Sequence, residues 1–152
     1  MTFQLDHFLP YRLSVAASRV SRRFARLYEA ESGISTPEWR VLAHLAEAGP
    51  VSVRDVFARV DMDKSTVSRA AARLEEAGFV SKLGHQADRR LVQLTLTPSG
   101  EALMARLGAV ADAFQAELAA ELGRDAAALD AALTRLIGET DARGEDGHAD
   151  AP

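Results

Sequence analysis

The chain contains no cysteine among its 152 residues. Disulfide bonds, thiolate zinc sites, cysteine nucleophiles and thiol redox sensing are therefore excluded together. Long apolar runs are also missing, because no stretch approaches the ~20 consecutive apolar residues that a membrane-spanning helix needs. The first residues, MTFQLDHFLPYRL, lack the basic leader and apolar run of a signal peptide. These features predict a cytoplasmic protein with no membrane partner.

Motifs for catalysis are equally scarce. The four histidines fall in different predicted elements, and no histidine–carboxylate set has the spacing of a metal site. The sequence shows no nucleophile motif and no glycine-rich phosphate loop. We therefore expect that the chain is not an enzyme and that it has no cofactor and no metal site.

Positive charge is scarce overall but is concentrated in the middle of the chain. The net charge is −4 at pH 7. Residues 51–96 carry 8 Lys and Arg against 6 Asp and Glu, whereas residues 97–152 carry 4 against 11. This asymmetry favours a central segment that binds a polyanion, held by a helical region that faces away from it.

The stretch from Asp61 to Phe79 predicts an amphipathic helix. Its apolar stripe at i, i+4 and i+7 is formed by Val67, Ala71 and Leu74. The opposite face carries small or hydroxyl side chains and two arginines, namely Ser65, Ser68, Arg69, Ala72 and Arg73. Asp63 is the predicted N-cap, and Gly78 is predicted to end the helix. Such a face suits contact with DNA, although a solvated helix is the alternative.

The preceding residues predict three helices. The first covers residues 6–31 and ends at Gly33, and the second begins at Thr36-Pro37-Glu38 with Thr36 as the capping hydroxyl. A short third helix is opened by Ser52 and Asp55 in a variant of the capping box. Together with the helix after Asp61, this short helix predicts a helix-turn-helix.

The residues after Gly78 change to an extended pattern. Two short apolar runs, around residues 80–83 and 91–96, flank the polar basic loop 84–90. Next to a helix-turn-helix, such a hairpin predicts the wing of a winged helix, with an incidental surface hairpin as the alternative. The basic loop would suit the narrow minor groove of DNA.

Two apolar helices follow the predicted wing. The seam of the first, begun at Thr97-Pro98, contains Leu103, Leu107, Val110, Phe114 and Leu118. A second helix follows Gly123, and residues 139–152 are predicted to be disordered. One winged helix cannot cover this apolar surface, so a second copy in a two-fold homodimer is the expected partner. The predicted organisation is an N-terminal dimerisation helix (1–35), a DNA-binding winged helix (36–98), C-terminal dimerisation helices (99–138) and an acidic tail (139–152).

Three motifs in register resemble the multiple-antibiotic-resistance-regulator (MarR) family of bacterial transcription factors. They are TPEWRVLAHL (36–45), DKSTVSRAAARLEEAGFV (63–80) and the wing sequence from Asp88-Arg89-Arg90 to Leu94, Leu96 and Thr97. The resemblance covers residues 6 to 138. It implies a mainly α fold with a small β-hairpin wing, in which a winged helix-turn-helix is flanked by long dimerisation helices.

The resemblance also implies the DNA contacts. The residues placed at the major groove or its phosphates are Ser65, Thr66, Ser68, Arg69 and Arg73, and the wing contacts are Asp88, Arg89 and Arg90. Arg90 would enter the minor groove with Asp88 steadying it. The expected target is a double-stranded, pseudo-palindromic operator with half-sites roughly 10 base pairs apart.

The family further implies control by a small ligand, often an aromatic acid. The candidate residues offer rings or cations that could hold a carboxylate: Tyr11, Arg12, Arg19, Trp39 and His44. Core packing of Trp39, a satisfied buried His44 and an interface ion pair of Arg12 are the structural alternatives. The expected function is a ligand-responsive transcriptional regulator that acts as a repressor. A constitutive DNA binder and a winged-helix module for protein interaction are the alternatives.

Overall fold

A computed structural model describes residues 2–84 and 92–144, with side chains described as far as residue 138. The chain divides into two compact units, Met1–Asp112 and Ala113–Pro152. Among the described residues, no helix combines the length and the apolar character of a membrane span.

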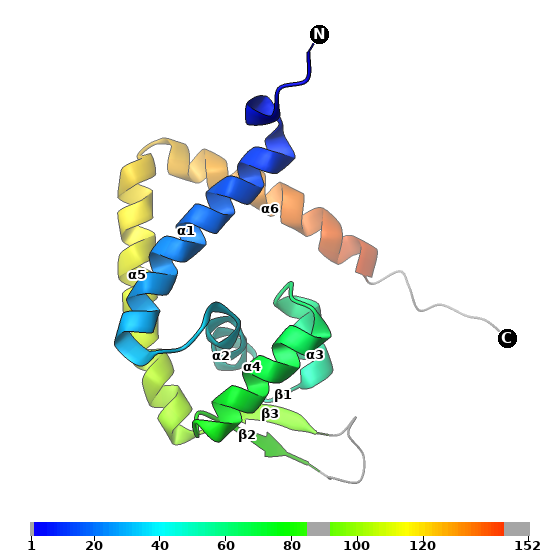
Figure 1. The fold of residues 1–152 in the computed structure, drawn as a ribbon, viewed down its shortest axis with the longest axis vertical. Coiled ribbons are helices and arrows are strands. Elements are labelled where there is room, and N and C mark those ends of the chain that lie inside the picture. Colours follow the sequence, from blue (N-terminus) through cyan, green and yellow to red (C-terminus); the bar gives the residue numbers. More distant parts are fainter. Residues whose placement is uncertain (1, 85–91, 145–152) are drawn as a thin grey trace, which may run out of the picture. The chain divides into compact units, whose positions relative to one another are not determined.

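The first unit contains a bundle of helices and a small sheet (Figure 1). Its elements are η1 (Leu5–His7), α1 (Leu9–Ser32), α2 (Thr36–Ala48), β1 (Val51–Ser52), α3 (Val53–Arg59), α4 (Lys64–Glu76), β2 (Val80–Leu83), β3 (Gln93–Leu96) and the beginning of α5 (Pro98–Leu122). The second unit contains the end of α5 and α6 (Asp125–Gly144). This architecture confirms the predicted fold, a mainly α winged helix with long terminal helices.

The sheet has three antiparallel strands in the order β1-β3-β2. In β2 and β3, which form the predicted hairpin, Val80 pairs with Leu96 and Lys82 with Leu94. On the other edge of β3, Val51 of β1 pairs with Leu94. The prediction missed β1, because a strand of two residues is too short to show an alternating pattern.

The core of the first unit lies where α2, α4 and β3 meet. The predicted apolar stripe of α4 is buried, with Val67, Ala71 and Leu74 between 0% and 4% exposed. These side chains pack into one cluster with residues of α2, β2, β3 and α5, namely Val41, Leu42, Leu45, Val80, Leu94, Leu103 and Leu107. The burial of this stripe fixes which face of α4 is turned outward.

The start of α2 corrects one predicted cap. Ser35, not Thr36, is the N-cap, because its side chain accepts from the Glu38 amide while the Glu38 side chain accepts from the Ser35 amide. The Thr36 hydroxyl instead forms a hydrogen bond with the hydroxyl of Tyr28 in α1. Three consecutive positions, Ser35-Thr36-Pro37, fit a helix start, and sequence alone does not show which hydroxyl faces the first turn.

Two predicted ends of helices also differ from the structure. The helix predicted from residue 6 begins at Leu9, because Pro10 occupies the first turn and residues 5–7 form a separate 3₁₀ turn. At the other end, α6 continues to Gly144, so residues 139–144 are helical where disorder was predicted. Extending an existing helix requires no new nucleation, and the Glu, Ala and Arg residues of this segment have high helix propensity. The remainder of the predicted tail lies outside the described residues.

Candidate nucleic-acid interface

The helix-turn-helix is formed by α3, a tight turn and α4. The turn includes Asp61, whose φ of 52° lies in the left-handed region. Aspartate adopts this conformation more readily than a β-branched residue does. As predicted, Asp63 is the N-cap of α4, and Gly78 leaves the helix with a φ of 82°. The sequence of the turn therefore determines the direction in which α4 leaves α3.

The outward side of α4 carries the five residues that were predicted to contact DNA. We call Ser65, Thr66, Ser68, Arg69 and Arg73 the recognition face. Four of them are exposed and Thr66 is half-buried, whereas Val67 and Ala70 between them are buried. The structure therefore brings these five side chains together on one accessible helix face.

Asp63 organises the beginning of the recognition face. One carboxylate oxygen accepts from the Thr66 amide and the Ser65 hydroxyl, both at 2.8 Å, and the other accepts from the Thr66 hydroxyl at 2.9 Å. These donors, led by the backbone amide of Thr66, lower the pKa of Asp63 to about 2. The cap was predicted from the sequence, but its hydroxyl partners were not, although both follow it within three residues.

Replacing Asp63 with alanine is expected to destabilise the fold at neutral pH but not near pH 2. The pKa of this carboxyl is lower in the folded chain, so its contribution to stability is present above the ordinary value of 3.8 and is lost as pH falls through about 2. The measurement is a urea denaturation midpoint for both proteins at a series of pH values. A difference between them that stays constant from pH 6 to pH 2 would contradict this role.

The two arginines of the recognition face differ in their surroundings. The guanidinium of Arg73 lies 3.9 Å from the Glu38 carboxylate of α2, with side-chain exposures of 68% and 13%. Arg69 is exposed and makes no ion pair with any residue that the structure describes. Arg73 is thus directed back towards α2, and Arg69 is the arginine best placed to extend to a base edge. No pattern in the sequence indicated that Glu38 would be the partner of Arg73.

The predicted wing contacts cannot be placed. Asp88, Arg89 and Arg90 lie outside the described residues. The described parts of β2 and β3 lead into the wing as a regular antiparallel pair. The role of Asp88, Arg89 and Arg90 at the minor groove therefore stays a prediction.

The candidate ligand residues do not form one site within a single chain. Tyr11, Arg12 and Arg19 are exposed along α1. Trp39 belongs to an aromatic cluster with Phe24 and Tyr28 of α1, with ring centroids 5.1 and 5.8 Å away. Tyr11 precedes Phe24 by 13 residues, and this separation along a helix amounts to roughly 20 Å. The i, i+4 spacing of Phe24 and Tyr28 was the available sign of this cluster in the sequence.

His44 occupies a different face of α2 from Trp39. Five residues separate them, so their side chains diverge by about 140° around the helix. His44 is 9% exposed, and its buried Nε2 has no hydrogen-bond partner among the described residues. A buried polar atom without a partner is costly, and an incoming polar group would satisfy it.

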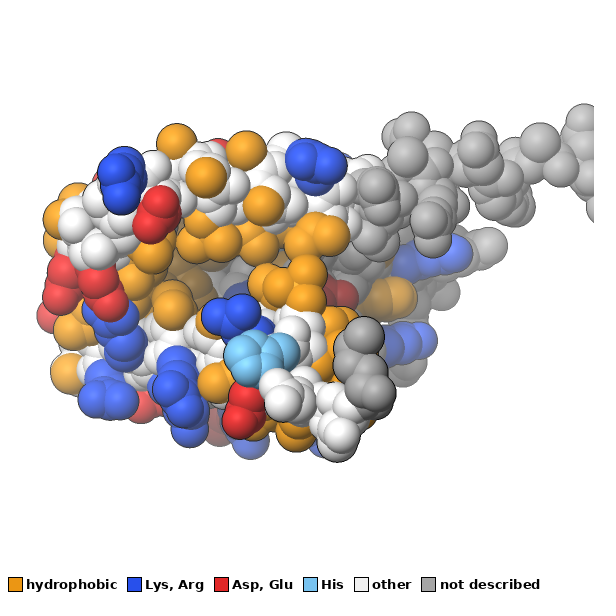
Figure 2. All heavy atoms as spheres, turned by 90° about the horizontal axis from the view of Figure 1, so that it is seen from above, with side chains coloured by type: hydrophobic (Ala, Val, Ile, Leu, Met, Phe, Trp, Pro, Cys, Tyr) orange, Lys and Arg blue, Asp and Glu red, His pale blue; other side chains and the backbone are white. Residues whose placement is uncertain are grey.

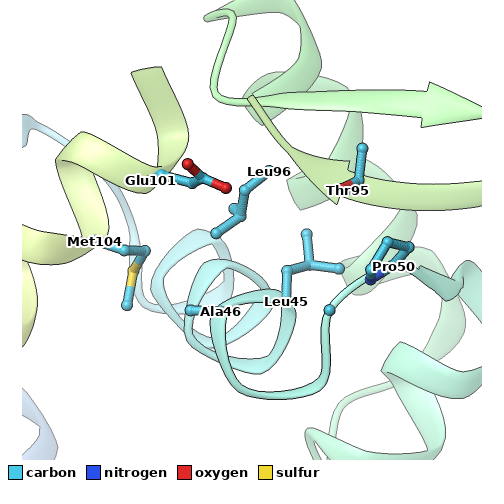
Figure 3. A pocket seen from close by; sticks show the side chains of 8 residues that line it. Leu45, Ala46, Pro50, Thr95, Leu96, Glu101 and Met104 are labelled. Carbon is cyan, nitrogen blue, oxygen red and sulfur yellow. The ribbon is translucent and has the colours of Figure 1, made fainter. Parts of the chain in front are cut away.

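A hollow of about 270 Å³ lies between the end of α2, β3 and the start of α5. Leu45 and Leu96 point towards each other across it, and the Glu101 carboxylate lies beside Leu96 (Figure 3). None of the five candidate ligand residues lines this hollow. Because Glu101 would repel a carboxylate, the hollow does not match the predicted aromatic acid.

The sequence and fold have clear relatives. The model of the MarR family matches residues 32–91, which include the helix-turn-helix. A MarR/EmrR family transcriptional regulator from Acinetobacter sp. ADP1 has the same fold, with a TM-score of 0.80, 25% identity, and coverage of 91% of this chain and 99% of that one. Residues 32–91 belong to the MarR family. This membership in a family of transcriptional regulators also confirms the expectation that the chain is not an enzyme.

Two further similar proteins are informative. The HTH-type transcriptional regulator FarR from Neisseria gonorrhoeae is 30% identical over 95 residues. The match spans 62% of this chain and 65% of FarR, slightly less than two thirds of that relative. The crystal structure of NadR in complex with 4-hydroxyphenylacetate is similar with a TM-score of 0.72 and 27% identity, and the match covers 84% of this chain and 94% of NadR.

Proposed function

We propose that this MarR-family chain is a homodimeric regulator that binds a pseudo-palindromic operator in double-stranded DNA and represses transcription. The observation that carries the proposal is the recognition face of α4, which presents Arg69 and two exposed serines while the opposite face is buried. Arginine that contacts guanine O6 and N7 is the commonest specific protein–DNA contact, and short hydroxyl side chains allow the helix to approach the bases closely.

The homodimer is supported by apolar side chains that are open to solvent in one copy. In α6 they follow a helical stripe, namely Leu129, Leu133, Leu136 and Ile137. In the N-terminal segment they are Phe3, Leu5, Phe8, Leu9 and Tyr11. Orange spheres in Figure 2 show hydrophobic side chains at the surface of one face. A second copy that covers such surfaces would place two recognition faces about 10 base pairs apart, as a two-fold operator requires.

The proposed effector is a small aromatic acid. NadR, which this chain resembles, was crystallised with 4-hydroxyphenylacetate. In this chain the exposed guanidinium groups of Arg12 and Arg19 could pair with a carboxylate, and the unpartnered Nε2 of His44 could meet a polar group of the ligand. Because the five candidates are spread along α1 and α2, only part of the set would share one site, or two copies would contribute to it.

Control would follow from unequal affinity of the effector for two arrangements of the dimer. An effector that binds more tightly to the arrangement in which the two recognition helices are wrongly spaced for the operator lowers the affinity for DNA. The loss can be no larger than the difference in the effector's affinity for the two arrangements. A coupling of about 1–3 kcal/mol weakens binding about 5–150-fold, which is enough to release a promoter.

Selection of duplexes from a random library tests the DNA part of the proposal. We expect the purified protein to enrich a two-fold symmetric site and to bind it with an affinity that falls steeply as salt rises. Size-exclusion chromatography with light scattering should give twice the mass of one chain. A monomer that enriches no sequence even at low ionic strength would contradict the proposal. Titration of 4-hydroxyphenylacetate and related acids against the selected duplex tests the effector separately.

A further inference from the structure

The start of α5 is fastened to the segment that leaves the recognition helix. The Thr97 amide donates to the Phe79 carbonyl at 3.0 Å, and the Thr97 hydroxyl donates to the Gly78 carbonyl at 2.6 Å. The same hydroxyl accepts from the Gly100 amide in the first turn of α5 at 3.1 Å. One side chain therefore caps α5 and ties it to the end of α4. We call Gly78, Phe79, Thr97 and Gly100 the α4–α5 joint.

Direct packing reinforces these hydrogen bonds. A Cβ atom added to Gly100 would lie 2.0 Å from the carbonyl oxygen of Phe79 and 3.0 Å from its carbonyl carbon. The first turn of α5 therefore rests against the backbone of Phe79 at a distance that no other residue at position 100 permits. The hydrogen bond from the Thr97 amide and the close contact of Gly100 both involve the Phe79 carbonyl, so the joint has little freedom to slide.

The joint is equally well connected to α4. The Phe79 amide donates to the Leu74 carbonyl at 2.9 Å, and the Gly78 amide donates to the Glu75 carbonyl at 3.0 Å. Both acceptors lie in the last turn of α4, only a few residues beyond the arginines of the recognition face. An unbroken series of hydrogen bonds thus runs from the last turn of α4 to the first turn of α5, a helix that continues to Leu122.

We propose that Thr97 and Gly100 are positioning residues for operator recognition, because they fix the direction of α4 relative to α5. Since α5 is part of the proposed dimerisation region, a rigid joint converts the geometry of the dimer into a fixed spacing between two recognition faces. The joint is thereby the element through which a movement of α5 would reach the DNA-reading surface. This inference rests on the proposed DNA-binding homodimer.

Thr97→Val tests the joint, because valine keeps the shape of threonine and removes its hydroxyl. Thr97→Ser retains the hydroxyl and serves as the rescue variant. Thr95→Val is the matched control, since the Thr95 hydroxyl, two residues earlier in the chain, makes no hydrogen bond with a described residue. The probe is the duplex that the wild type selects, together with derivatives that carry one or two extra base pairs between the half-sites.

We expect Thr97→Val to reduce affinity for the selected duplex about threefold to tenfold, which corresponds to the net contribution of about one hydrogen bond for the whole dimer. Its affinity for the lengthened duplexes should change less, so that the preference for the selected spacing shrinks. Thr97→Ser and Thr95→Val should keep the wild-type preference. A uniform loss at every spacing would show a merely structural role and would overturn the proposal.

Hydrogen exchange without DNA separates this inference from the proposed function. In Thr97→Val, the amides of Gly78 and Phe79 should exchange about threefold to tenfold faster than in Thr95→Val, because the hydroxyl no longer holds this segment. Unchanged exchange at both amides would refute the joint. If the wild type selects no duplex, the DNA-binding proposal fails, and the exchange rates still decide whether Thr97 holds the end of α4.

Discussion

Arg69→Ala is expected to weaken binding of the selected duplex about 30-fold or more. A bidentate arginine–guanine contact discriminates by about 1–3 kcal/mol, and a homodimer makes it twice, which gives about 30-fold to 10⁴-fold in total. The reason for choosing Arg69 is its position: it is exposed on the recognition face and makes no ion pair with a described residue. The measurement is a fluorescence-anisotropy titration at fixed salt concentration.

Two variants make this experiment specific. Arg135→Ala removes the same charge from an exposed position in α6, so it should change the affinity less than twofold. Arg73→Ala should weaken binding less than Arg69→Ala, because Arg73 lies beside Glu38. If Arg69 reads a base, its loss relaxes sequence preference, whereas loss of a phosphate contact lowers affinity for all duplexes and reduces the salt slope. Equal affinity of wild type and Arg69→Ala would exclude α4 as the reading helix.

The elements with strong sequence patterns were predicted well. The stripe of Val67, Ala71 and Leu74 is buried as expected. The N-cap Asp63 precedes α4, and Gly78 with its positive φ follows the C-cap, and the chemistry of both positions is local. Local signals of this kind depend on neighbours within four residues, so the sequence contains them. The recognition face follows from the same pattern, because the buried stripe determines which residues point outward.

Features that depend on distant residues were not predicted. The pairing of Val51 with Leu94, the ion pair between Glu38 and Arg73, and the contact of Gly100 with Phe79 join positions at least 21 residues apart. No spacing rule connects such positions. The ligand candidates show the same limit. Ring and charge chemistry selected Tyr11 and Trp39, but Phe24, which contacts Trp39, lies roughly 20 Å along α1 from Tyr11.

Gly100→Ala is expected to destabilise the fold by about 3 kcal/mol, the upper part of the range for overpacking a well-filled site. The new Cβ would lie 2.0 Å from the Phe79 carbonyl oxygen, which is backbone and cannot rotate away as a side chain could. Relief requires the first turn of α5 to move away from Phe79, and the hydrogen bond from the Thr97 amide to the same oxygen would then weaken. The measurement is the urea denaturation midpoint at one fixed protein concentration, because a homodimer gains stability by mass action.

Gly108→Ala provides the matched control in the same helix. A Cβ at Gly108 meets nothing within 4 Å, so this substitution should be neutral or should stabilise α5 by up to about 1 kcal/mol through helix propensity. The two identical changes, eight residues apart, thus have opposite expected signs. If alanine is tolerated equally at both positions, α5 does not rest against Phe79. Its first turn would then be free to move without the recognition helix, and the link between dimer geometry and DNA reading would have to lie elsewhere.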